Sequence, residues 1–213
     1  MIVIFDLDGT VWDSEDGIVG SLEHTFSSLG MEAPERSVLT ANVGPPLQLM
    51  LAELGIPAEL VDDATLRYRE RYVEWGAYQA SLYPGVLPAI DRITAAGHRL
   101  ATATSKGEGP TQQMLEHFGI TERFEVIGAA SMDASAITKS AVLARTLEAL
   151  GHPDPDECWM VGDRSYDVTG SATFEIPCIG VLWGYGTETE LVDAGAAHVV
   201  ADPAELPPLI RTR

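Results

Sequence analysis

The sequence is poor in lysine and in basic residues as a whole, and it has no long hydrophobic run. Only two of its 213 residues are lysines, and 13 lysines and arginines face 32 acidic residues, which gives a formal net charge of −19 at pH 7. This charge argues against binding to the phosphate backbone of nucleic acids or to an anionic membrane. No apolar stretch approaches the roughly 20 residues that span a bilayer, and Asp6 interrupts the apolar start too early for a secretory signal. We therefore expect a soluble, cytoplasmic protein with no nucleic acid polymer and no membrane as partner.

Cysteine and histidine do not indicate a metal site of nitrogen and sulfur ligands. The two cysteines, Cys158 and Cys178, lie in the apolar stretches CWMV and CIGV, which predicts buried free thiols and no disulfide. The five histidines have no spacing typical of metal ligands. A hydrophobic content of 46% over 213 residues is enough for one large domain, or for a core with a smaller inserted unit.

From residue 84 onward, helical and extended patterns alternate along the chain. The predicted helices are 86–96, 110–118, 138–150, a short helix around Val168, and 187–194, and the predicted strands are 99–104, 124–128, 158–161, 178–181 and 198–200. Strands that alternate with such helices form right-handed βαβ units and a mostly parallel sheet. The strands are continuously apolar, which is typical of burial on both faces. We predict an α/β core with a doubly wound, mostly parallel, Rossmann-like sheet.

Residues 14–83 break this rhythm and contain no convincing strand. Apolar residues at helical spacing follow Ser14, which we expect to cap a first helix. Two further helices are predicted to begin at Pro45-Pro46 and at Pro57. We predict an all-helical cap domain, residues 14–83, inserted into an α/β core made of residues 1–13 and 84–213. Because ligands gather beyond the carboxyl ends of the strands in an open parallel sheet, we expect the cap to act as a lid over that site.

The first motif is at the start of the chain, MIVIFDLDGT, where an apolar strand runs directly into Asp6 and Asp8. In an extended backbone, residues i and i+2 point to the same side. Two carboxylates placed in this way repel each other, so they need a cation or a shared proton. Gly9 permits a tight turn and Thr10 offers a hydroxyl. Taken alone, the segment is also compatible with an Asp-Gly turn followed by a helix-capping Thr.

A second acidic cluster, VGDRSYD, follows the apolar strand CWMV. Asp163 would leave that strand at its carboxyl end, and Asp167 would face it from one helical turn later. Asp6 and Asp163, with Asp167 as a further candidate, would then converge from strands that are adjacent in the sheet. Hard oxygen ligands of this kind suit Mg²⁺, which binds octahedrally and keeps some of its water. Together the two clusters predict a magnesium site.

The two lysines are placed where they can serve an anion. Lys106 follows a predicted strand. The end of that strand carries the hydroxyls of Thr102, Thr104 and Ser105, which can donate to a phosphate. Lys139 lies in the first turn of a predicted helix, where its charge opposes the helix dipole, and this favours an anionic partner. For Lys106, a surface role is at least as well supported as a role in the site.

In this order, DLDGT, ATATSK, Lys139 and GDRSYD resemble the motifs of the haloacid dehalogenase superfamily of phosphotransferases. The resemblance covers nearly the whole chain, and the insert after DLDGT is similar to the small helical cap of that superfamily. The segments VGPPL, YPGV and IGVLWGYG most resemble phosphoglycolate phosphatases and their close relatives. The resemblance implies a Mg²⁺-dependent phosphatase, with a small phosphorylated metabolite such as phosphoglycolate as its substrate.

The resemblance also implies a role for individual residues. Asp6 would be the nucleophile that forms an aspartyl-phosphate, and Asp8 would be the general acid and base. Thr104 and Ser105 would hold phosphate oxygens, and Lys139 would bind both the nucleophile and the phosphoryl group. General chemistry agrees, because a loose, anionic transition state asks mainly for positioning and positive charge.

The same resemblance implies a Mg²⁺ site. Its ligands would be Asp6, the backbone carbonyl of Asp8, and Asp163, with Asp167 binding directly or through water. Unaided phosphomonoester hydrolysis is so slow that enzymes accelerate it by up to about 10²¹-fold. A metal and a covalent intermediate together are an established way to reach such accelerations.

Neighbouring activities of the superfamily differ at single positions. A haloacid dehalogenase needs neither Asp8 nor Asp163, and the superfamily ATPases carry Thr where Asp8 stands, so we expect rapid hydrolysis. A 5′-nucleotidase, a pyrophosphatase and, less well supported, a sugar phosphomutase are alternatives that the motifs also fit. A non-enzymatic receiver domain combines similar residues with Mg²⁺, but it is shorter and has no helical insert like residues 14–83.

Overall fold

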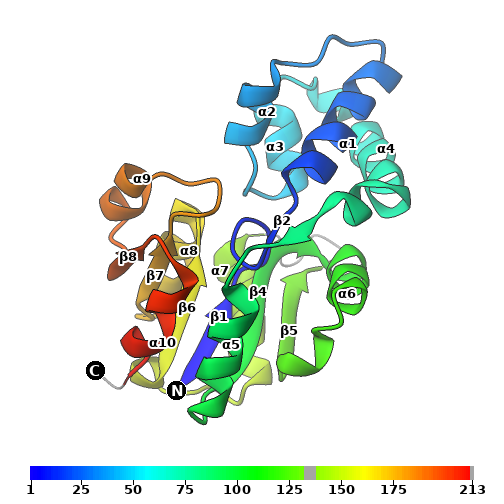
Figure 1. The fold of residues 1–213 in the computed structure, drawn as a ribbon. Helices are drawn as coiled ribbons and strands as arrows, with labels where there is room; N and C mark the ends of the chain where they lie inside the picture. The colour runs from blue at the N-terminus through cyan, green and yellow to red at the C-terminus, as the bar shows by residue number, and fades with distance from the viewer. Residues whose placement is uncertain (132–137, 212–213) are drawn as a thin grey trace. The chain divides into compact units, whose positions relative to one another are not determined.

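The computed structural model describes residues 1–131 and 138–211 and divides into two compact units (Figure 1). The core unit consists of Met1–Asp13 and Leu82–Arg213, and the helical unit consists of Ser14–Ser81. The chain therefore leaves the core unit shortly after its first strand and returns to it for the remainder of its length.

The core unit is built on a six-stranded parallel sheet with the strand order β5-β4-β1-β6-β7-β8. Its strands are β1 Ile2–Phe5, β4 Arg99–Gly107, β5 Val126–Ala130, β6 Cys158–Gly162, β7 Cys178–Val181 and β8 His198–Val200. This order confirms the predicted doubly wound α/β fold. Because β1 is central and buried along its whole length, the residues that follow it emerge in the middle of the sheet edge.

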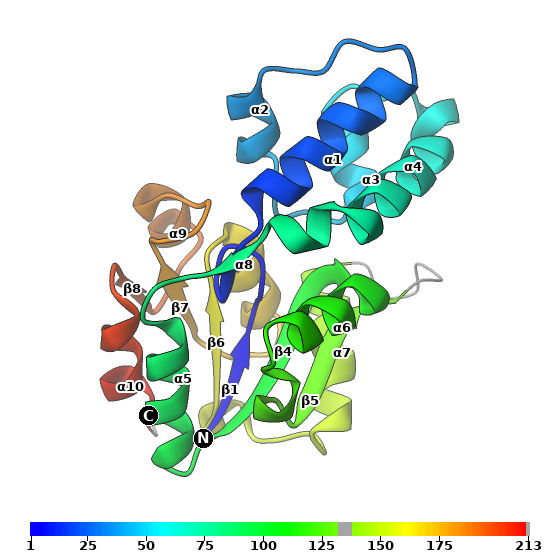
Figure 2. The same cartoon turned by 45° about the vertical axis from the view of Figure 1, so that its right-hand side comes forward.

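Helices cover both faces of this sheet. They are α5 Val86–Ala95, α6 Glu108–His117, α7 Lys139–Ala149, α8 Ser165–Ala172, α9 Glu188–Asp193 and α10 Leu206–Leu209, with short 3₁₀ turns at Thr121–Arg123, Pro155–Glu157 and Pro203–Glu205. Helix α7 packs against α8, and α5 packs against α10. Figure 2 shows α5 in front of the sheet and α8 behind it. The two cysteines, Cys158 and Cys178, are free and buried in this core, as predicted.

The pairing of β1 with β6 determines where the acidic motifs meet. Phe5 is the register partner of Val161, and the amide of Asp6 donates to the carbonyl of Val161 at 2.8 Å. Parallel strands end at the same edge of a sheet, so the residues after β1 and after β6 lie side by side. The predicted adjacency of these two strands is confirmed.

The helical unit has its own apolar interior. Its elements are α1 Glu15–Ser28, α2 Arg36–Ala41, α3 Leu47–Glu53, α4 Val61–Glu74 and the 3₁₀ turns Ala58–Leu60 and Gly76–Gln79. Helix α1 packs against α4, and the rings of Tyr68 and Tyr72 stack with centroids 5.7 Å apart. A Cβ added to Gly17 would lie 2.1 Å from the carbonyl oxygen of Gly76. Helix α1 therefore approaches this turn backbone to backbone.

Several short elements differ from the sequence-based expectation. We found no convincing strand in residues 14–83, but β3 Ser81–Leu82 pairs with β2 Trp12–Asp13 in a two-stranded sheet. Helix α2 was not predicted, and Ser14 precedes α1 without a side-chain capping hydrogen bond. Strands of two residues are too short to show an alternating pattern.

Among the described residues, no helix has the length and apolar composition of a membrane-spanning segment.

The contact between α1 and the turn at Gly76 can be tested by Gly17→Ala. The added methyl group would meet the Gly76 carbonyl oxygen at 2.1 Å, so we expect the free energy of unfolding to fall by about 1–3 kcal/mol, as for other overpacked sites. Urea unfolding measures it. The matched control is Gly109→Ala in α6, where a new Cβ has nothing within 4 Å and a helical Ala is expected to be neutral or stabilising. Equal stabilities of the two variants would contradict this close packing.

Candidate active site

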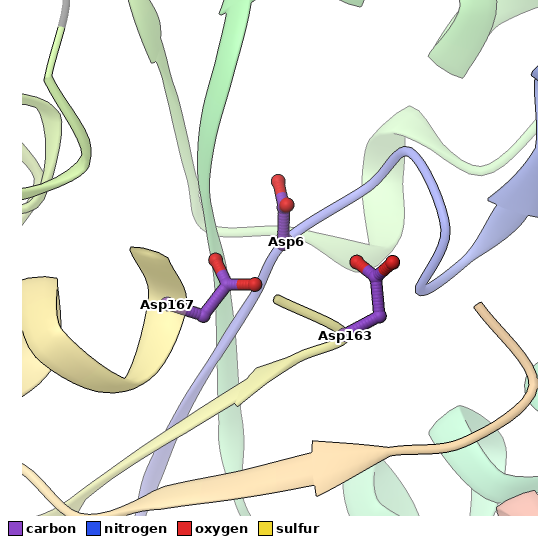
Figure 3. A group of neighbouring side chains, drawn as sticks. All are labelled: Asp6, Asp163 and Asp167. Carbon is purple, nitrogen blue, oxygen red and sulfur yellow. The ribbon is translucent and has the colours of Figure 1, made fainter. Parts of the chain in front are cut away.

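Three aspartates from different parts of the chain meet at the carboxyl edge of the sheet (Figure 3). Asp6 follows β1, Asp163 follows β6, and Asp167 lies in the first turn of α8. Each offers one carboxylate oxygen, and these oxygens all lie within 4.8 Å of one another. The geometry therefore brings together the three acidic residues that the sequence predicted to converge.

Glycines allow this close approach. A Cβ on Gly162 would lie 2.2 Å from Cγ of Asp167, and a Cβ on Gly9 would lie 2.2 Å from Oδ2 of Asp163. Gly9 also has a φ of +77°, a conformation that other residues adopt only with strain. The glycines of DLDGT and VGDRSYD are thus required by the space around the carboxylates.

Lys139 lies between two of the three carboxylates. It is the first residue of α7 and is buried, with Nζ 3.0 Å from Oδ1 of Asp6 and 2.7 Å from Oδ1 of Asp167. Nζ also donates to the carbonyl of Ala103 at 2.9 Å. Burial alone would lower the pKa of Lys139, but the charges of Asp167 and Asp6 outweigh it and raise the pKa above its usual value. The lysine is therefore held as a buried ammonium group.

The proton affinities of the acids reflect their crowding. Burial raises the pKa of Asp6 to about 6, although the charge of Lys139 opposes the shift. Burial and the charges of Asp167 and Asp6 raise the pKa of Asp163 well above its usual value. Asp163 accepts hydrogen bonds from Thr10 Oγ1 at 3.3 Å and from the amide of Tyr185 at 2.8 Å.

The three carboxylates fit a divalent metal ion. They are hard oxygen donors, they come from separate elements, and together they exceed the single charge of Lys139. A cation such as Mg²⁺ would offset both the mutual repulsion and the loss of hydration. The chemistry of this donor set therefore suits a divalent cation that prefers oxygen ligands.

Asp8 is held apart from the three-carboxylate cluster. Its Oδ1 accepts a hydrogen bond from Nε1 of Trp12 at 2.8 Å, and its Oδ2 is 2.8 Å from Nζ of Lys106. A surface role for Lys106 was an open interpretation of the sequence, and the structure contradicts it, since the side chain is only 8% exposed. The lysine lies beside the site because β4 continues to Gly107, beyond the predicted end of the strand.

The hydroxyl-bearing residues at the end of β4 differ in their burial and in their hydrogen-bond partners, although the sequence suggested one shared role. Thr104 is buried, and its Oγ1 accepts from the amide of Lys106 at 3.3 Å. Ser105 is half-buried and follows it directly. Thr102 donates its hydroxyl hydrogen to the carbonyl of Gly128 at 3.0 Å. It therefore serves the pairing of β4 with β5, and it is not a candidate phosphate ligand.

Sequence reasoning missed a set of residues that support the site from the loop after β7. Trp183 Nε1 donates to the carbonyl of Thr10 at 2.9 Å, and the Tyr185 hydroxyl lies 3.2 Å from Oδ1 of Asp13. A Cβ on Gly186 would lie 1.9 Å from the carbonyl oxygen of Asp163. These residues belong to IGVLWGYG. The sequence singles out this segment only by its resemblance to phosphoglycolate phosphatases, and no local pattern in it indicates these contacts.

Comparison with known proteins gives one family. The profile of the haloacid dehalogenase-like hydrolases matches residues 3–181. The tyrosine-protein kinase PtkA of Mycobacterium tuberculosis is 42% identical over 205 residues, which cover 96% of this chain and 69% of that protein. A 5′-nucleotidase of Pseudomonas aeruginosa is 31% identical over 205 residues, which cover 96% of this chain and 92% of that protein.

Two further similarities extend this comparison. A phosphoglycolate phosphatase of Agrobacterium fabrum is 30% identical over 215 residues, which cover 98% of this chain and 91% of that protein. A crystal structure described as a predicted phosphatase from Clostridium acetobutylicum superposes with a TM-score of 0.93 at 33% identity, covering 98% of this chain and 97% of that one. The similar proteins thus differ in the activities for which they are named, and each matches nearly the whole of this chain.

The crowding of the acids predicts that Asp163→Asn stabilises the metal-free protein. The folded protein holds the proton of Asp163 more tightly than the unfolded chain does, so the stability of the wild type falls as the pH rises from the unfolded pKa toward the folded pKa. The variant lacks this loss. In EDTA, we expect its Tm to exceed that of the wild type, by a margin that widens as the pH rises from about 4, near the unfolded pKa, toward the folded pKa.

Added Mg²⁺ provides the complementary measurement. A ligand that binds only the folded protein raises Tm, so Mg²⁺ is expected to stabilise the wild type more than Asp163→Asn. The control is Asp193→Asn, which neutralises an exposed acid and should leave both measurements unchanged. A variant less stable than the wild type in EDTA over this whole range would contradict the electrostatic account.

Proposed function

The chain belongs to the haloacid dehalogenase-like hydrolase family, and from its site we propose that it is a Mg²⁺-dependent phosphatase that hydrolyses a small phosphomonoester through an aspartyl-phosphate. One observation carries the proposal. Asp6 lies at the end of the central strand, with a buried lysine 3.0 Å from its carboxylate and two further carboxylates beside it. A nucleophile, a fixed positive charge and metal ligands are the components that phosphoryl transfer needs.

The reaction proceeds in two steps. Asp8 enters the first step protonated. A carboxylate oxygen of Asp6 then forms a bond to phosphorus, and the bond from phosphorus to the ester oxygen breaks as Asp8 gives that oxygen its proton. A water molecule then attacks the phosphorus and gives a proton to Asp8, and Asp6 is released as a carboxylate. Lys139 stabilises the charge on both the nucleophile and the phosphoryl oxygens. Thr104 and Ser105 are proposed to hold the phosphoryl oxygens.

The metal ligands are proposed to be the carboxylates of Asp6 and Asp163 and the backbone carbonyl of Asp8, with Asp167 binding directly or through water. When bound, Mg²⁺ supplies positive charge to the phosphoryl group. Asp167 also keeps Lys139 in place, through its contact of 2.7 Å.

Phosphoglycolate is the proposed substrate, and a nucleoside monophosphate or pyrophosphate is the alternative. A similar protein named phosphoglycolate phosphatase supports the first substrate, and one named 5′-nucleotidase supports the nucleoside monophosphate. A panel of phosphomonoesters, ranked by kcat/KM, tests the order. A sugar phosphomutase remains a less well supported alternative, and it would move phosphate between sugar hydroxyls in place of releasing it.

The similarity to a protein named tyrosine-protein kinase favours a second candidate, transfer of phosphate to a tyrosine. An aspartyl-phosphate can pass its phosphoryl group to water or to a hydroxyl group, so one core can serve both reactions. We favour hydrolysis because the proposed general acid and base, Asp8, can activate water for attack on the aspartyl-phosphate. Incubation with ATP and a tyrosine-containing peptide distinguishes the two: phosphopeptide formation faster than phosphate release from esters would favour the kinase.

The helical unit is proposed to select the substrate. The phosphoryl group is common to every candidate, so the residues that bind it do not discriminate among leaving groups. The insert, residues 14–83 in the sequence-based assignment, begins a few residues after Asp6 and Asp8. We propose that it is a cap that excludes bulk water during the reaction.

The nucleophile assignment predicts that Asp6→Asn abolishes turnover, because an amide is a very poor nucleophile. Release of p-nitrophenol from p-nitrophenyl phosphate measures it, with EDTA silencing the wild type and Mg²⁺ restoring it. Asp8→Asn is expected to lower kcat by roughly 10²–10⁴-fold, the range of lost acid–base catalysis. This loss should be smaller for p-nitrophenyl phosphate than for alkyl esters. Turnover by Asp6→Asn, or by the metal-free wild type, would contradict the mechanism.

The cap assignment predicts that a short Gly/Ser linker in place of residues 16–80 lowers kcat/KM far more for the best natural substrate than for p-nitrophenyl phosphate. The activated ester needs less protonation and less positioning. Steady-state kinetics of both esters measure the difference. Equal losses would show that the helical unit supports the core and does not select the substrate.

A further inference from the structure

Lys106 is one of the two lysines of the chain, and the mechanism above gives it no role. Its Nζ lies 2.8 Å from Oδ2 of Asp8, with 8% of the lysine side chain and 16% of the aspartate side chain exposed. A lysine this deeply buried needs an anionic partner, because an unpaired buried charge is strongly destabilising. The structure supplies that partner in Asp8.

The backbone around Lys106 is shaped to place it there. Between Thr104 and Gly107, β4 advances three residues while its partner β5 advances one, from Ala129 to Ala130. Extra residues in one strand re-aim the side chains at that point. The amide of Lys106 donates to Oγ1 of Thr104 at 3.3 Å. The irregularity therefore holds the lysine backbone in a defined position at the end of the strand.

The other oxygen of Asp8 is held from a different side. Nε1 of Trp12 donates to Oδ1 at 2.8 Å, and the tryptophan side chain is fully buried. The two donors thus come from separate segments, one from β2 and one from the end of β4. A carboxylate with a hydrogen-bond or ion-pair partner on each of its oxygens has little freedom to rotate.

We propose that Lys106 is a positioning residue for Asp8: together with Trp12 it fixes the side chain that, once protonated, gives a proton to the leaving group and then takes one from water. The inference rests on the proposed function, since it takes its meaning from the proton transfers of Asp8. Proton transfer requires hydrogen-bond reach in a defined geometry. Displacing a reacting group by about 1 Å can cost about 10²-fold in rate.

The test is Lys106→Met, measured as kcat and KM with an alkyl phosphomonoester and Mg²⁺. We expect kcat to fall by at least about 10-fold while KM changes by less than about 3-fold, because the lysine acts on Asp8 and does not bind the ground-state substrate. Lys106→Arg, which keeps a charged donor, is expected to recover part of kcat. The matched control is Arg145→Met, which removes a cation from an exposed pair with Glu108 and should leave both constants unchanged.

The double variant shows whether the effect passes through Asp8. In an Asp8→Asn background, Lys106→Met is expected to have no further effect on kcat, since the group that it positions is gone. A melting curve provides a readout that is independent of activity. Asp8→Asn leaves the buried ammonium without its ion pair and should lower Tm, and the added Lys106→Met should recover part of the loss.

The outcomes separate the two proposals. A loss of kcat by Lys106→Met that is as large in the Asp8→Asn background would overturn the positioning role. So would a rise in KM at unchanged kcat, which would show that Lys106 binds the substrate directly. Full activity in Asp8→Asn itself would overturn the proposed role of Asp8 and this inference together.

Discussion

The electrostatic imbalance at the sheet edge is the constraint on which the rest of the site depends. Three buried carboxylates share one buried lysine, and the pKa values of Asp6 and Asp163 are raised as a consequence. Burying charges without full compensation costs stability. In the proposed reaction, a cation and an anionic phosphoryl group complete this charge balance. The electrostatic cost of crowding the acids would then contribute to the binding of both.

The backbone leaves enough space for the three carboxylates to lie this close together. Central parallel strands deliver their carboxyl ends to one edge, and glycines at positions 9 and 162 leave room where any side chain would collide with a carboxylate. The loop after β7 closes the arrangement from the other side, through the Tyr185 amide on Asp163 and the Trp183 indole on the backbone of Thr10. The acids are therefore fixed by several segments, which favours preorganisation over rearrangement during the reaction.

Proteins similar over nearly the whole chain are named as a kinase, a nucleotidase and a phosphatase. The proposed mechanism accounts for this spread, because a core that forms an aspartyl-phosphate does not determine which hydroxyl group accepts the phosphoryl group next. Discrimination among substrates and phosphoryl acceptors must then come from the general acid and base and from the surfaces around the leaving group. The surroundings of Asp8 and the helical unit are the regions where such differences can arise.

The sequence by itself determined the α/β core, the order of most of its elements, and the convergence of Asp6, Asp163 and Asp167. Hydrophobic periodicity is a local signal over several turns or strand residues, and parallel pairing then places every strand end at one edge. Lys139 was also predictable, because a cation in the first turn of a helix is unfavourable without an anion. The two-residue strands carry no such periodic signal.

Only the tertiary structure decided which side chains hold the acids in place. Lys106 faces Asp8 across two neighbouring strands, and Trp183 and Tyr185 reach partners that lie 173 and 172 positions away in the sequence. Thr102 and Thr104 look alike in ATATSK, yet one hydroxyl donates to the neighbouring strand and the other accepts from Lys106. These contacts depend on strand register and on an irregularity in β4. A one-residue change in either would turn the same side chains to the opposite face of the sheet.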